Sequence, residues 1–117
     1  MKPELNENAL RVLEKRILAR DQRGRISETP EQMFRRVARC VAEADLKHGS
    51  LEDSTASESA FFEVMTSLEF LPNSPTLMNA GRNLAQLSAC FVLPIEDSMD
   101  SIFGTLRDTA LIQKTGG

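Results

Sequence analysis

The residues of this sequence that could carry redox chemistry are its two cysteines, Cys40 and Cys90. Cys90 lies in a short apolar segment, Gln86 to Ile95, which follows a polar and turn-rich loop. The nearly continuous apolar character of this segment predicts a buried β-strand. A strand would hold a thiol rigidly, which matters for any thiol that bridges to a second sulfur, because disulfide geometry is narrow. Taken alone, a cysteine in a buried strand is more often a packing residue.

The loop before that segment, from Phe70 to Gly81, carries polar groups of a second kind. Pro72 and Pro75 are incompatible with a continuing helix. The other notable side chains favour turns and local hydrogen bonds, and they are Asn73, Ser74, Thr76, Asn79 and Gly81. This composition predicts an ordered loop in which Ser74 could cap a turn between the two prolines.

Cys40 and the single histidine, His48, have no comparable surroundings. Cys40 lies beside the apolar stripe of an expected helix, where a free cysteine usually behaves as a small packing residue. No cysteine or acidic pair stands at ligand spacing around His48, and zinc sites need three or four assembled ligands. We therefore expect no metal site, and a structural or capping role for His48.

Length and composition limit the possible classes of protein. A chain of 117 residues can bury one core, and its 41% apolar and 26% charged residues are typical of globular proteins. The net charge is −3, and the basic residues are scattered among acidic ones, so nucleic-acid binding is not expected. The sequence contains neither a run of about 20 apolar residues nor a signal-peptide core, which predicts a cytoplasmic protein without a membrane partner.

Apolar residues spaced three and four apart predict four helices that must position the loop and the strand. They are expected over 6–19, from Thr29 to about His48, around 60–68 after an acidic Ser-rich loop at 51–59, and from Asp97 to about Lys114. The second start is the clearest, because Thr29, Pro30 and Gln32 form a capping box with proline at the first helical position. Gly49 is expected to end this helix in a left-handed conformation. The expected inner faces comprise Met33, Phe34, Val37, Ala38, Val41 and Ala42 in the second helix, and Phe61, Val64, Met65 and Leu68 in the third.

Three local patterns together resemble the adenosylcobalamin-dependent (class II) ribonucleotide reductases. They are PNSPTLMNAG from Pro72 to Gly81, LSACFVLPIEDSMDSIF from Leu87 to Phe103, and ALIQKTGG from Ala110 to Gly117. The run SETPEQMFRRVA from Ser27 to Ala38 agrees with them. Their order and spacing extend the resemblance over nearly the whole chain, with the first 25 or so residues the least informative.

The resemblance implies a mainly α chain that leads into a ten-stranded α/β barrel. Residues 1–81 would form an N-terminal helical region with a substrate-side loop, and residues 82–117 would begin the barrel with its first strand and helix. The barrel would be incomplete in this chain. A first strand without neighbours has two unpaired edges, so we expect the isolated chain to self-associate.

The same resemblance implies a function and its residues. Reductases of this family convert ribonucleotides to 2′-deoxyribonucleotides for DNA synthesis through a cysteine thiyl radical, and Cys90 would be one of the two cysteines that supply the electrons. Ser74, Ala89, Cys90 and Gly117 would contact the substrate, although Gly117 could also serve only as a helix cap. The implied cofactor is adenosylcobalamin, with its binding site outside this chain, and the implied partners are the rest of the reductase and an external thiol reductant such as thioredoxin.

No cysteine follows Cys90, so the partner of the reducing pair and the radical cysteine would both lie outside these residues. We therefore expect the chain alone to be inactive. An alternative is a non-catalytic helical module that binds or regulates a reductase in place of its N-terminal region. A further alternative is a piece of a class I reductase large chain, which fits the loop and glycine patterns less well.

Overall fold

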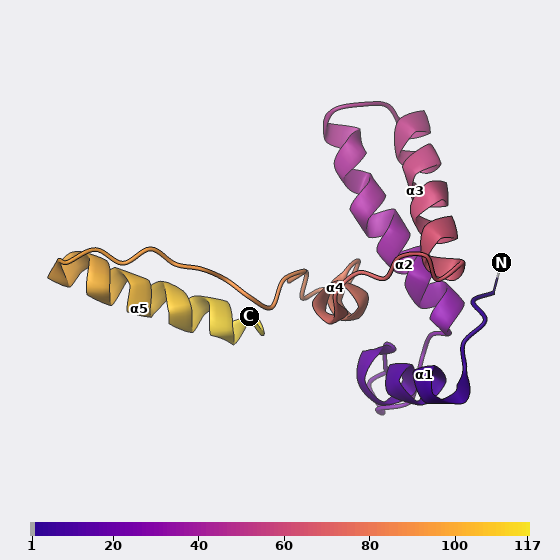
Figure 1. The fold of residues 1–117 in the computed structure, drawn as a ribbon, viewed down its shortest axis with the longest axis horizontal. Coiled ribbons are helices and arrows are strands. Elements are labelled where there is room, and N and C mark those ends of the chain that lie inside the picture. The colour runs from indigo at the N-terminus through magenta and orange to yellow at the C-terminus, as the bar shows by residue number, and fades with distance from the viewer. Residues whose placement is uncertain (1) are drawn as a thin grey trace.

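The computed structural model describes residues 2–117. Its helices, in chain order, are α1 (Glu7–Val12), the π-helix η1 (Leu13–Ile17), α2 (Pro30–Ala42), the 3-10 helix η2 (Glu43–Lys47), α3 (Leu51–Thr66), α4 (Ser74–Asn79) and α5 (Met99–Lys114). Figure 1 shows a helical body from α1 to α4, with α5 and an extended segment projecting away from it. The radius of gyration is 17.5 Å, whereas a compact domain of this length would have about 13 Å.

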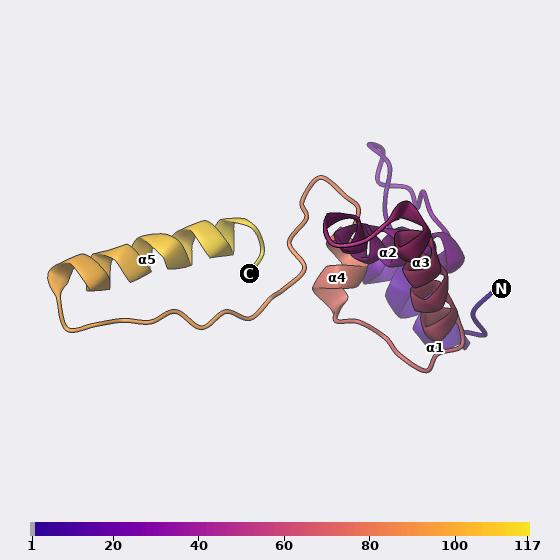
Figure 2. The same cartoon turned by 90° about the horizontal axis from the view of Figure 1, so that it is seen from above.

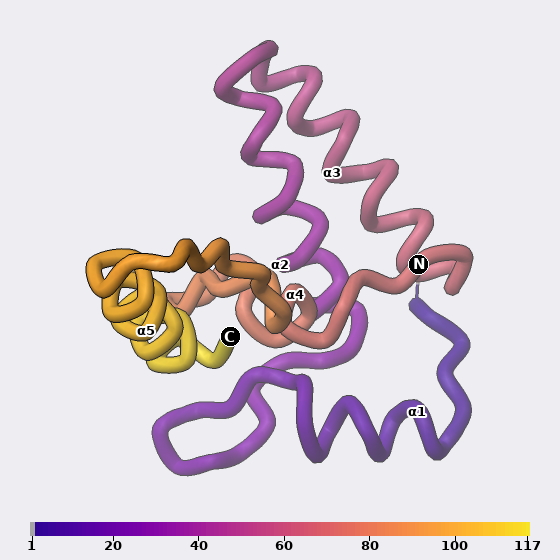
Figure 3. Tube along the Cα trace, turned by 60° about the vertical axis from the view of Figure 1, so that its left-hand side comes forward, coloured from indigo at the N-terminus to yellow at the C-terminus, as the bar shows by residue number. Residues whose placement is uncertain are grey.

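The helical body is organised around α2, which packs against α3 in an antiparallel hairpin (Figure 3). The predicted inner face of α2 is confirmed except at Val41, which remains 39% exposed. The guanidinium of Arg35 lies 4.0 Å from the ring centroid of Phe62, so a cation–π contact adds to the apolar packing between the two helices. The core comprises Ile17, Leu18, Met33, Phe34, Val37, Ala38, Phe62, Met65, Leu77 and Ala80.

The predicted start of α2 is confirmed. The backbone N–H of Gln32 donates to Thr29 Oγ1 at 3.2 Å, and that of Thr29 donates to Gln32 Oε1 at 2.9 Å. The predicted left-handed cap at Gly49 is wrong, because the positive-φ glycines among residues 2–117 are 24, 81 and 116. A Cβ on Gly49 would instead lie 2.8 Å from the carboxylate of Asp53, so glycine there permits close approach of that side chain.

The expected loop at 51–59 is also wrong, because α3 begins at Leu51. A second capping box starts it: the N–H of Ser50 donates to Asp53 Oδ2 at 2.8 Å, and the N–H of Asp53 donates to Ser50 Oγ at 3.2 Å. Several polar side chains of this run form hydrogen bonds within the hairpin. Buried Ser54, for example, donates from its hydroxyl to the carbonyl of Ala42 at 3.0 Å. The Ser-x-x-Asp pattern was therefore a helix start that the high serine content obscured.

The inner face of α3 differs from its predicted composition. Met65 is buried as expected, but Phe62 is buried in place of Phe61. Leu68 is exposed because it lies beyond the helix end with a φ of 62°, a left-handed conformation that is unfavourable for a branched side chain. The first helix is likewise shorter than predicted, since α1 passes into η1 and helical structure ends at Ile17.

A partly buried ion pair fixes α4 to the body. Arg36 and Glu28 are 2.8 Å apart, and their side chains are only 16% and 10% exposed. The guanidinium of Arg36 also donates to the carbonyls of Leu77 and Ala80, at the end of α4. Glu28 Oε1 in turn accepts from the backbone N–H of Ala19. One charged pair therefore joins the connector before α2, the middle of α2 and the last turn of α4.

The predicted strand from Gln86 to Ile95 is not formed, and no residue from 2 to 117 belongs to a β-strand. An isolated antiparallel bridge pairs Arg20 with Ile26 around the turn at Gly24. The 86–95 segment is extended, but a strand needs a neighbour that accepts and donates its backbone hydrogen bonds. Residues 2–117 supply no such neighbour. The segment is therefore extended, but it forms no backbone hydrogen bonds to a second strand. The continuation into a barrel stays a prediction.

α5 runs beside this extended segment, apart from the helical body (Figure 2). The predicted helix from Asp97 is confirmed to within two residues, with Ser98 as its N-cap. None of the helices within residues 2–117 is long and apolar enough to cross a membrane.

The exposed apolar side chains of this projecting part lead to a prediction of self-association. They include Val92, which is 98% exposed, together with Ile95, Met99, Phe103 and Leu106. Exposed apolar side chains in this number, next to an extended segment without backbone pairing, favour contact with another chain. We expect sedimentation velocity of the 117-residue chain to show species larger than a monomer. A monodisperse monomer that melts cooperatively would contradict this expectation.

Candidate functional site

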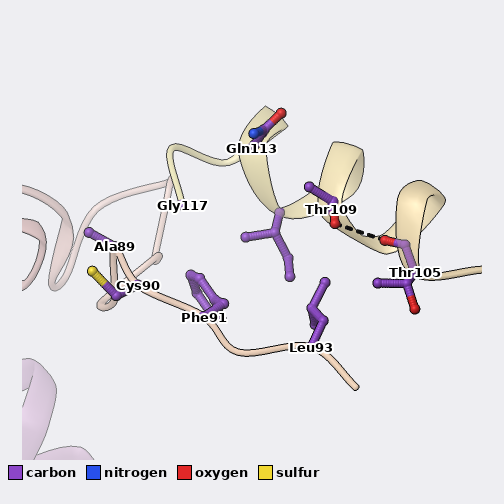
Figure 4. Close-up of a pocket in the computed structure, with 9 residues that line it drawn as sticks. Ala89, Cys90, Phe91, Leu93, Thr105, Thr109, Gln113 and Gly117 are labelled. Atoms are coloured by element: carbon purple, nitrogen blue, oxygen red, sulfur yellow. Dashed lines mark hydrogen bonds between the residues drawn. The ribbon is translucent and has the colours of Figure 1, made fainter. Parts of the chain in front are cut away.

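A groove between the extended segment and α5 contains most of the residues that the sequence predicts for the site (Figure 4). Its volume is about 550 Å³. Ala89, Cys90 and Gly117 all line it, although 27 positions separate the last two in the chain. Its polar groups come from three side chains of α5, which are Thr105, Thr109 and Gln113.

Side chains along the extended segment alternate as they do in a strand. Phe91 and Leu93 point toward α5, whereas the thiol of Cys90 points away from that helix (Figure 4). Val92, the next residue of the same parity as Cys90, is 98% exposed. Successive side chains of extended backbone lie on opposite faces. The segment therefore presents Cys90 and Val92 on one face and packs the other face against α5.

The hydroxyl of Thr105 helps to hold the two elements together, because it donates to the carbonyl of Pro94 at 2.8 Å. At the other end of the groove, Gly117 packs against Phe91 and Ile112. A Cβ on Gly117 would lie 2.6 Å from Phe91 Cε2 and 2.5 Å from Ile112 Cγ2, which is closer than real Cβ atoms approach. A side chain at 117 would therefore displace Phe91 or Ile112, and glycine lets the backbone lie close to both.

The two thiols have different surroundings. Cys90 is exposed, and Cys40 is half-buried against the core of the body. The packing role predicted for Cys40 is therefore confirmed. Both cysteines are free, so Cys90 can take part in disulfide chemistry only with a sulfur from outside the described part of the chain.

Ser74 does not line the groove. It is the first residue of α4, a short helix that replaces part of the predicted loop, and Pro75 occupies an early helical position that tolerates proline. The cap is Asn73, whose side chain accepts from the N–H of Thr76 at 3.0 Å, so the capping role considered for Ser74 is wrong. Ser74 is exposed at the N-terminal end of α4.

Hydrogen bonds nevertheless connect α4 to the segment that carries Cys90. The hydroxyl of Thr76 donates to the carbonyl of Leu87 at 3.0 Å, and the amide of Asn79 donates to the carbonyl of Gln86 at 2.8 Å. The side-chain amide of Gln86 then donates to Thr115 Oγ1 at 3.1 Å. Sequence reasoning identified Thr76 and Asn79 only as groups that stabilise a loop, and their partners could not be read from the local pattern.

The described residues do not fit a corrinoid or a bound metal. Within 2–117 no three histidine, cysteine or acidic side chains gather into a group that could hold a metal ion. The imidazole of His48 is exposed at the end of η2 and has no acidic cluster around it. No step of the chemistry is therefore derived through a cofactor in this part of the molecule.

Comparison with known proteins gives a consistent set of similarities. A family model described as "Ribonucleotide reductase, all-alpha domain" matches residues 3–85. The vitamin B12-dependent ribonucleoside-diphosphate reductase of Thermoplasma acidophilum is 40% identical over 97% of the chain, and that of Mycobacterium tuberculosis (strain H37Rv) is 46% identical over the same share. The ribonucleoside-diphosphate reductase large subunit of Danio rerio is 35% identical over 80% of the chain. The chain spans 22%, 16% and 11% of these three relatives, respectively.

Proposed function

Because the chain belongs to the ribonucleotide reductase family, whose all-alpha domain covers residues 3–85, we propose that it works as the N-terminal part of an adenosylcobalamin-dependent reductase. In this proposal residues 1–81 form the helical region and the substrate-side loop, and residues 82–117 begin the catalytic barrel. The whole enzyme would reduce ribonucleotides to 2′-deoxyribonucleotides, and the 117-residue chain alone would be inactive.

The assignment to the cobalamin-dependent class is supported by the order of the similarities. Two relatives whose names state vitamin B12 dependence are 40% and 46% identical to the chain. The large or α subunits of Danio rerio and Helicobacter pylori (strain J99) are 35% and 32% identical. This difference favours the cobalamin-dependent class over class I.

The observation that carries the proposed chemistry is the placement of Cys90. Cys90 is exposed and lines the groove together with Ala89 and Gly117, and its thiol points away from α5 (Figure 4). A thiol so placed is accessible to both a substrate and a second sulfur. A thiol packed against α5 would be accessible to neither.

The proposed step balances as a two-electron reduction. A thiyl radical on a cysteine beyond residue 117 removes the 3′-hydrogen of the ribose and later returns it. The thiols of Cys90 and a partner cysteine each give up one hydrogen, and their sulfurs form a disulfide. One hydrogen forms the new C2′–H bond, and the other leaves with the 2′-hydroxyl as water. The enzyme then needs an external dithiol, such as thioredoxin, to reduce the disulfide.

The remaining predicted site residues would contact the substrate from two sides. Ala89 and Gly117 line the groove beside Cys90, and glycine at 117 has no side chain of its own to keep a substrate from the main chain. Ser74 would contribute from α4, which hydrogen bonds connect to the segment just before Ala89. We place adenosylcobalamin in the part of the reductase beyond residue 117, and the whole reaction in the cytoplasm, where both free cysteines would stay reduced.

The proposal is tested by completing the enzyme. The 117-residue chain is mixed with a polypeptide that covers the remainder of the Mycobacterium tuberculosis relative, together with adenosylcobalamin, a dithiol and ribonucleoside diphosphates. We expect deoxyribonucleotide formation from the mixture and none from either polypeptide alone. In a second arm, the 117-residue chain and that polypeptide are joined as one fused chain. This fused reductase does not depend on the assembly of two separate pieces. An inactive fused chain, beside an active intact relative, would contradict the proposal.

A second candidate function is a non-catalytic module that binds a reductase in place of its own N-terminal region. The exposed apolar surface of Val92, Phe103 and Leu106 favours it, since that surface would suit a protein partner. Adding the chain to the intact relative distinguishes the two candidates. A module should lower the activity of the intact enzyme in proportion to its concentration, and an inactive fused chain together with such inhibition would favour it.

A further inference from the structure

Side-chain hydrogen bonds link α4, the Cys90 segment and the last turn of α5. The hydroxyl of Thr76 lies 3.0 Å from the carbonyl oxygen of Leu87 and 2.5 Å from Asn73 Oδ1, so two acceptors share its single proton. Asn79 donates to the carbonyl of Gln86 at 2.8 Å. Gln86 donates from its side chain to Thr115 Oγ1 at 3.1 Å. Each of these bonds joins elements that share no regular backbone pairing.

We propose that Thr76, Asn79 and Gln86 are positioning residues that set the register of the Cys90 segment and connect it to the glycine turn at Gly117. The inference rests on the proposed function of Cys90. None of the three needs to touch the substrate, because their effect passes through the backbone of the extended segment.

Register matters here because side chains of extended backbone alternate between faces. A slip of one residue would turn Cys90 toward α5 and would bring Phe91 to the face that the thiol now occupies. Two successive carbonyls, those of Gln86 and Leu87, accept from the same short helix. The segment therefore cannot slip by one residue without losing or exchanging both bonds.

At one end, this series of hydrogen bonds is anchored to the helical body through α4. Arg36 binds the carbonyls of Leu77 and Ala80, so the C-terminal end of α4 is held to the buried core of the body. Thr76 and Asn79 lie on the same helix as Leu77. A displacement of the 86–87 backbone would thus require either the loss of these donors or a movement of α4 against the ion pair.

At its other end the linkage reaches the turn that closes the groove. Thr115 Oγ1, which accepts from Gln86, itself donates to the carbonyl of Ile112 at 2.8 Å. The backbone N–H of Gly117 also donates to that carbonyl, at 3.2 Å. Cys90 and Gly117 are therefore held to the same framework from opposite sides of the groove.

The test uses Thr76→Val, which keeps the shape of the side chain and removes the donor, and Thr76→Ser, which restores a hydroxyl. Thr55→Val in α3 is the matched control, because the hydroxyl of Thr55 also donates to a carbonyl, that of Leu51 at 2.8 Å, far from the groove. In the fused reductase we expect Thr76→Val to lower kcat about tenfold to a hundredfold, as misplacement of a reacting group does, with a smaller change in KM. Thr76→Ser should recover most of the activity, and Thr55→Val should leave kcat unchanged.

Hydrogen exchange in the 117-residue chain provides a readout that does not depend on activity. In Thr76→Val the amides of peptides covering 74–82 and 110–117, which contain hydrogen-bonded backbone N–H groups, should exchange about fivefold faster, as expected for the loss of a hydrogen bond. The same peptides should be unaffected in Thr55→Val. If kcat in an active fused enzyme and exchange in both peptides remained at their original values in Thr76→Val, the positioning role would be overturned. An inactive unsubstituted fused enzyme would count against the proposed function instead, and exchange alone would then decide the linkage.

Discussion

Replacing Cys90 with serine should abolish turnover of the completed reductase while leaving the helix content of the chain unchanged. A serine hydroxyl has nearly the shape of the thiol, but it cannot form a disulfide and so cannot supply its share of the two electrons. Cys90 is exposed and lies outside the core cluster, so its loss removes no packing from the helical body. Turnover is measured with the fused enzyme, and helix content by far-ultraviolet circular dichroism of the 117-residue chain.

Cys40→Ser is the control for this experiment. Cys40 packs against the core and makes no contact with the groove, so its replacement should retain turnover at a modest cost in stability. If Cys90→Ser lost helical structure, or if the fused enzyme with Cys90→Ser kept its normal rate with thioredoxin as the reductant, the redox role of Cys90 would be wrong.

Replacing Arg36 with alanine should destabilise the helical body by about 2 kcal/mol, since it leaves the partly buried carboxylate of Glu28 without its charged partner. The same change removes two donors to the end of α4. The free energy of unfolding is measured by urea titration. Arg39→Ala is the matched control on the same helix, because Arg39 and Glu43 are 3.8 Å apart and 74% and 59% exposed. Its expected cost is at most about 0.5 kcal/mol.

The same ion pair predicts how stability depends on pH. Burial alone would raise the pKa of Glu28, but hydrogen bonds from Arg36 and from the N–H of Ala19, with the charge of Arg36, outweigh it and hold this pKa below its ordinary 4.5. A carboxylate with a depressed pKa stabilises the folded state at pH values above about 4.5, and its contribution is lost as the pH falls through the lower folded-state value. This acid-dependent loss should be smaller in Glu28→Gln. Equal losses in the two proteins, or equal costs of Arg36→Ala and Arg39→Ala, would contradict the structural role of the pair.

The sequence predicted those parts of the fold that depend on neighbouring residues. The capping box at Thr29 and the apolar stripe of α2 are local patterns, and both are confirmed. The start of α3 was equally local, but the serines around Ser50 favoured a loop over a capping box. The strand predicted at 86–95 is not formed, because a strand needs a hydrogen-bonded partner strand. Residues 2–117 do not contain that partner, and a local pattern cannot reveal its absence.

The candidate site was likewise only partly predictable from the sequence. The resemblance identified Ala89, Cys90 and Gly117, and the structure brings them to one groove. The hydrogen bonds of Thr76, Asn79 and Gln86 join residues that are 11, 7 and 29 positions apart, so no local pattern could have paired them. In our proposal the direction of the Cys90 thiol depends on these bonds, and that direction became visible only in three dimensions (Figure 4).

The central claim, that Cys90 is one of the two reducing cysteines, is tested most directly by mapping disulfides after a single turnover. The fused enzyme is fully reduced, freed of dithiol, allowed to react once with ribonucleotide and adenosylcobalamin, and then alkylated and analysed by mass spectrometry. We predict that the peptide containing Cys90 is recovered in a disulfide with a cysteine beyond residue 117, in proportion to the deoxyribonucleotide formed. Product formation with Cys90 recovered entirely as the alkylated thiol would contradict the claim.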